Sequence, residues 1–166
     1  MTPAGRLLAT LQPAAAVLLG AAAFTGYLPA LGVMEVGRHI VWGFAVALAA
    51  AFAHAMTLFY FAGIGVSLRQ SVGGQAGGQE CLEASARLRR RLAPWLGAAL
   101  FTLMAAVILG GGSHTRSLPS WVHHAASLAS LAANLPASFI ARRAIAEQER
   151  WIARAQRLLE RPASGG

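Results

Sequence analysis

The stretch IVWGFAVALAAAFAHAMTLFYFAGIGV, residues 40–66, decides the fold because it runs for 27 residues without an Asp, Glu, Lys or Arg. A helix of about 20 apolar residues crosses the hydrocarbon core of a bilayer. Three further runs, at about 7–31, 92–109 and 121–140, also lack charged residues. Strands would leave unpaired edges in hydrocarbon, and the runs lack the alternation of a membrane barrel. The sequence therefore predicts an all-α protein.

Composition places this protein in a membrane. Of its 166 residues, 56% are hydrophobic and 12% are charged, and the mean hydropathy is +0.53, which is too apolar for an ordinary soluble domain. We expect an integral membrane four-helix bundle with up-down-up-down topology. Its partners would include the lipid bilayer that surrounds it. The predicted spans are about 7–31, 36–67, 92–112 and 120–140.

The basic residues predict the orientation. All 14 are arginines. Arg38 and Arg116 lie in two of the connecting segments, and the other twelve lie before the first run, between the second and third runs, or after the fourth. This positive-inside asymmetry predicts that both termini are cytoplasmic in a bacterial inner membrane. The net charge of +8 thus reports topology and attraction to anionic lipids, and we expect no nucleic-acid partner.

Two cytoplasmic segments accompany the predicted spans. Within the loop 68–91, the glycine-rich part 70–78 predicts a flexible linker, and 79–91 predicts a short basic helix that runs into the third span. Residues 1–140, including this loop, form the predicted bundle. Residues 141–166 form an amphipathic cytoplasmic helix and tail. We expect its apolar stripe to lie on headgroups or against the loop helix, with a docking surface for another subunit as the alternative.

Histidines carry the candidate chemistry, because ionisable groups in or beside a membrane are costly and tend to be functional. On this topology His39 begins the second helix, and His123 and His124 begin the fourth, all at the outer face. These two helices run the same way and occupy diagonal corners, where facing side chains build ligand sites. Two imidazoles at matched height are what a bis-histidine haem requires. The sequence therefore predicts one haem b held by His39 and by His123 or His124.

The fourth helix favours His123 over His124. A small and polar face runs from His123, whereas the parallel face from His124 carries leucines. Polar and small residues in membrane helices face partner helices, and leucines can face lipid. The polar face consists of His123, Ser127, Ser130, Asn134 and Ser138.

His54 is the one deep histidine, roughly 22 Å along the helix from His39 at 1.5 Å per residue. We expect a helix-to-helix hydrogen bond there. The alternative is a proton relay or a quinone contact with Thr57 and Tyr60 nearby, so His54 stays among the candidate cofactor-facing residues.

A metal site and simple anchoring are the competing interpretations of the outer histidines. Glu35 lies four residues before His39, and His114 lies in the loop before the fourth helix. Together with His123 they form a ligand set suited to a transition metal ion. Interfacial histidines can also serve only as amphipathic anchors.

These patterns predict a small cytochrome b-like electron-transfer subunit of a larger membrane complex or homo-oligomer, with quinone as a further candidate partner. A self-contained enzyme is not expected, because no phosphate-binding loop, catalytic triad or carboxylate pair occurs. The alternative is a cofactor-free accessory or scaffold subunit.

Overall fold

The computed structural model describes residues 1–29 and 31–160, and it confirms the predicted four helices. They are α1 (Pro3–Thr25), α2 (Val36–Val72), α3 (Gly78–His114) and α4 (Ser120–Glu160), and the described residues contain no strand. Position 30, near the end of the first predicted span, and the predicted tail at 161–166 lie outside the described residues.

The first helix begins and ends earlier than the predicted 7–31. It begins at Pro3 because the Thr2 hydroxyl accepts a hydrogen bond from the Gly5 backbone N–H, 3.0 Å away, and because proline suits the first helical position. It ends at Thr25, and hydrogen-bonded turns follow. Gly32 adopts a φ of +69°, which glycine tolerates without strain.

The predicted loop 68–91 is mostly helical. α2 continues to Val72 and α3 begins at Gly78, so only a short turn separates them. The reason is burial: Leu68 and Val72 pack with Cys81 of α3 and Ala155 of α4 in one apolar cluster. The basic loop helix is therefore the first part of α3, and the C-terminal extension is a direct continuation of α4 that packs against α2 and α3.

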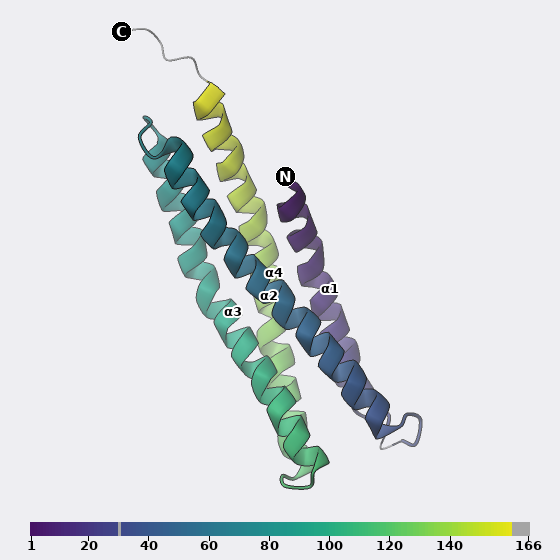
Figure 1. Ribbon diagram of the computed structural model, residues 1–166. Coiled ribbons are helices and arrows are strands. Elements are labelled where there is room, and N and C mark those ends of the chain that lie inside the picture. The colour runs from purple at the N-terminus through teal and green to yellow at the C-terminus, as the bar shows by residue number, and fades with distance from the viewer. Residues whose placement is uncertain (30, 161–166) are drawn as a thin grey trace, which may run out of the picture.

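Consecutive helices lie side by side and run in opposite directions, and α4 also packs against α1 (Figure 1). Across the diagonals, the backbones of α2 and α4 come closer together than those of α1 and α3. Small side chains make the close approach between α1, α2 and α3: Ala15, Ala47, Ala50 and Ala53 pack with Leu103. In the interior, His54 of α2 meets Asn134 of α4.

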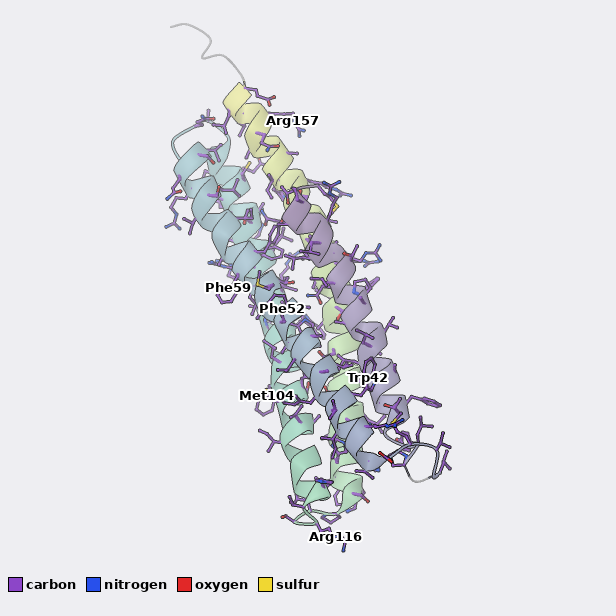
Figure 2. All side chains as sticks on the ribbon, turned by 45° about the vertical axis from the view of Figure 1, so that its right-hand side comes forward. Trp42, Phe52, Phe59, Met104, Arg116 and Arg157 are labelled. Atoms are coloured by element: carbon purple, nitrogen blue, oxygen red, sulfur yellow. The ribbon has the colours of Figure 1, made fainter. Side chains whose placement is uncertain are left out.

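Of the described helices, α1, α2 and α3 are long and apolar enough to cross a membrane. α4 is long enough but not apolar enough, because its first half carries His123, His124 and Asn134 and its second half is charged. Large apolar side chains project outward from the bundle, including Trp42, Phe52, Phe59 and Met104 (Figure 2). These helices indicate a lipid bilayer environment.

Candidate cofactor site

His39, His123 and His124 form a cluster, the histidine cluster, at the end of the bundle where α2 and α4 begin. His39 and His123 are each the fourth residue of their helix, which places them at the same height. Their ring centroids are 6.5 Å apart with an interplanar angle of 62°. The two imidazoles therefore meet edge to face.

Both facing imidazoles are held through Nδ1. The His123 Nδ1 lies 3.2 Å from the Ala106 carbonyl oxygen of α3, which only accepts, so this nitrogen carries the proton. The His39 Nδ1 lies 3.5 Å from the Thr25 hydroxyl, which itself donates to the Ala22 carbonyl. Neither Nε2 has a hydrogen-bond partner among the described residues. An imidazole with its Nδ1–H anchored and its Nε2 lone pair free can ligate a metal ion.

Two glycines bring helix backbone up to these rings. A Cβ on Gly110 of α3 would lie 2.8 Å from the His123 Cε1, and a Cβ on Gly26 after α1 would lie 3.2 Å from the His39 Cε1. Any larger residue would displace the imidazoles. The glycines thus fix the positions of both rings from the side.

His124 has a different neighbour. Its ring stacks on Tyr27 with centroids 5.2 Å apart and planes within 8°. The polar face of α4 that begins at His123 turns inward, since Ser130, Asn134 and Ser138 are buried, whereas Leu128 and Leu135 are exposed. The structure therefore places His123, rather than His124, against His39.

The predicted metal set is not gathered at one point. Glu35 precedes α2 at the surface and forms an exposed ion pair with Arg38, 3.9 Å away, and His114 ends α3 in an exposed position. Within residues 1–29 and 31–160, no three His, Cys, Asp or Glu side chains lie close enough to hold a metal ion.

His54 is fully buried, and its Nε2 lies 2.8 Å from the Asn134 Oδ1 on α4. The expected helix-to-helix hydrogen bond is therefore confirmed. Gln12 of α1, which was not among the predicted site residues, is equally buried at the α1–α2 contact. An amide within an apolar run was the signal that could have identified it.

A second polar centre lies at the opposite end of α1. The buried Glu149 carboxylate accepts hydrogen bonds from the Thr2 backbone N–H at 2.6 Å, the Thr2 hydroxyl at 2.5 Å and the Tyr60 hydroxyl at 2.7 Å. Burial opposes ionisation, but the bonds from Thr2 and Tyr60 outweigh it and hold the pKa of Glu149 below its ordinary value. This contact was not predicted, because Glu149 lies on a segment expected to be peripheral.

Comparison with known protein families, with characterised proteins and with solved structures finds no match to this chain. The fold and the candidate site define it as an all-α protein with apolar helices and a paired histidine site.

Proposed function

We propose that this protein is a small cytochrome b-like electron-transfer subunit that binds one haem b through the Nε2 atoms of His39 and His123. The proposal rests on how the imidazole rings of His39 and His123 are held. Each comes from a different helix, each has Nδ1 anchored, and each has an Nε2 without a hydrogen-bond partner in the described part of the chain. Haem, when bound, supplies one-electron transfer.

The chain's own residues would position and insulate the ligands. The Ala106 carbonyl and the Thr25 hydroxyl orient the rings and increase their basicity as ligands. Gly26 and Gly110 lack side chains, so the His39 and His123 rings can pack directly against the backbone there. Such a site at one end of the bundle is suited to exchanging electrons with a partner protein in a larger membrane complex.

The proposed orientation places α1, α2, α3 and the first half of α4 across a bacterial inner membrane. The histidine cluster would then lie at the outer face, with the arginine-rich end in the cytoplasm. Arg116 and Arg157 lie at opposite ends of the molecule (Figure 2). A membrane-impermeant thiol reagent tests this in a Cys81→Ser background. Intact cells should label a Ser117→Cys protein, and a Gln156→Cys protein should be labelled only after permeabilisation; the reverse pattern would contradict the orientation.

A visible absorption spectrum of the purified, reduced protein tests the cofactor. We expect a sharp haem band that His39→Ala and His123→Ala each abolish. His114→Ala is the matched control, because it removes an exposed histidine from the same end of the bundle, and it should keep the band. A featureless spectrum from haem-supplied, fully assembled material would reject the proposal in favour of a cofactor-free accessory subunit.

A further inference from the structure

The buried imidazole of His54 has one nitrogen whose protonation the structure fixes. The Asn134 amide donates from Nδ2 to the Ala99 carbonyl at 3.2 Å and to the Ser130 carbonyl at 2.8 Å, so its Oδ1 is the atom that faces His54 Nε2. An amide oxygen only accepts hydrogen bonds, and Nε2 must therefore carry the proton. Nδ1 is left as a bare acceptor, and it has no partner among the described residues.

A second acceptor without a donor lies at the α1–α2 contact next to it. The Gln12 Nε2 donates to the Thr57 hydroxyl at 2.8 Å and to the Ala53 carbonyl at 3.1 Å. Since both amide hydrogens are used, the Gln12 Oε1 can only accept, and it too has no partner within the described part of the chain. Ala53 directly precedes His54, so both acceptors belong to one interior layer of the bundle.

The described residues that surround this layer are uncharged. Facing it are Gln12 from α1, Ala99 from α3 and Asn134 from α4, with apolar neighbours such as Ala50. The apolar runs of all four helices lack Asp, Glu, Lys and Arg. On α2 the nearest titratable group is Tyr60, and its hydroxyl donates to Glu149, roughly 22 Å along α4 from Asn134.

Two buried hydrogen-bond acceptors in an uncharged interior require a hydrogen-bond donor. A water molecule or a proton can fill this role without the space that a larger ligand would need. Further buried polar atoms of α4, the Ser138 hydroxyl and the Gln148 amide, also lack a partner among the described residues. These groups offer water further hydrogen-bonding sites between His54 and the Glu149 end of the bundle.

We propose that His54 is a proton-binding site in the interior of the bundle, supplied through bound water. The Nδ1 lone pair forms an N–H bond with a proton that bulk water delivers through the bound water, and the imidazole becomes an imidazolium. The new N–H then donates, through that water, toward the Gln12 Oε1. Release reverses the step, so no oxidant or reductant is needed. The proposal does not depend on haem binding.

Nitrogen NMR of ¹⁵N-histidine-labelled protein in lipid nanodiscs tests it. The His54 signals are those lost in His54→Gln, and contacts with the Asn134 side chain identify them independently if this variant fails to fold. Near neutral pH we expect a protonated Nε2, an unprotonated Nδ1 and a water cross-peak to Nδ1. As the pH falls toward about 4, the Nδ1 signal should move to the protonated position. An Nδ1 signal that stays unprotonated throughout would overturn the proposal.

A second variant tests the role of Gln12. Gln12→Leu removes the acceptor toward which the new N–H points, so the midpoint of the His54 titration should fall by about one pH unit, a tenfold loss of proton affinity. Thr10→Val is the matched control on α1, since the exposed Thr10 bonds only carbonyls of its own helix. If the His54 titration has the same midpoint in Gln12→Leu as in Thr10→Val, the assigned proton path is contradicted.

Discussion

His54 and Asn134 lie 80 positions apart in the chain, yet the His54 Nε2 and the Asn134 Oδ1 are 2.8 Å apart across the diagonal of the bundle. The same amide donates to the Ala99 carbonyl of α3. One side chain of α4 therefore connects three helices at a level where the interior is otherwise apolar or uncharged.

Asn134→Ala should lower the free energy of unfolding by about 1–2 kcal/mol, because it leaves the His54 Nε2–H without an acceptor in the interior. Unfolding by SDS titration in mixed micelles measures this. Thr102→Val is the control, since the Thr102 hydroxyl bonds only carbonyls of its own helix, and it should change stability by less than about 0.5 kcal/mol. Equal effects of the two substitutions would show that the interhelical bond contributes nothing.

Tyr60→Phe should destabilise the bundle by about 1–2 kcal/mol. It removes a hydrogen bond of 2.7 Å to a buried carboxylate and leaves the Thr2 bonds in place. The comparison is Tyr27→Phe, which keeps the ring stacked on His124 and removes a hydroxyl that has no bond within the described residues. The same SDS titration applies, and a larger loss in Tyr27→Phe than in Tyr60→Phe would refute the expectation.

Glu149 should make stability depend on acid pH. Its pKa in the folded protein lies below the ordinary value of 4.5. The contribution of the carboxylate is therefore fully present above about pH 4.5 and is lost as the pH falls through the folded-state pKa. We expect the stability difference between the wild-type protein and Glu149→Gln to be constant from about pH 7 to about pH 5 and to shrink below about pH 4. A difference that grows on acidification would contradict the assigned direction.

Two neighbouring glycines of α3 should respond differently to substitution by alanine. A Cβ on Gly110 would lie 2.8 Å from the His123 Cε1 and force the ring away from the Ala106 carbonyl, whereas a Cβ on Gly111 meets no atom within 4 Å. Gly110→Ala should cost about 1–3 kcal/mol, and Gly111→Ala should be neutral or stabilising by up to about 1 kcal/mol. Thermal unfolding and the His123 NMR signals measure both effects. An unmoved His123 signal in Gly110→Ala would exclude the close contact.

The exposed pair of Arg154 and Glu80 should contribute little. The guanidinium and the carboxylate are 2.5 Å apart, but both side chains are about half exposed, at 45% and 50%. Solvent screening and side-chain entropy limit such pairs to about 1 kcal/mol or less. Arg154→Ala should therefore change the free energy of unfolding by less than about 1 kcal/mol, and the difference should fall further at high salt. A salt-independent loss of several kcal/mol would contradict this assignment.

By itself, the sequence determined the class of protein and the faces of its helices. Uncharged runs of membrane-spanning length require helices, and the three- and four-residue spacing of small and polar side chains on α4 indicated that His123 and Asn134 turn inward. Position within the helix also placed His39 and His123 at one height, because both lie one turn from a helix start. These features follow from local periodicity and composition.

Only the tertiary structure decided which polar groups meet. Gln12 bonds Thr57, and Asn134 bonds His54. The Glu149 carboxylate accepts hydrogen bonds from Thr2 and Tyr60. Each contact joins residues more than 40 positions apart, so it depends on how the helices rotate and cross rather than on any local pattern. The continuation of α2 to Val72 has the same origin, because burial of Leu68 and Val72 against Cys81 and Ala155 stabilises the helix beyond its apolar run.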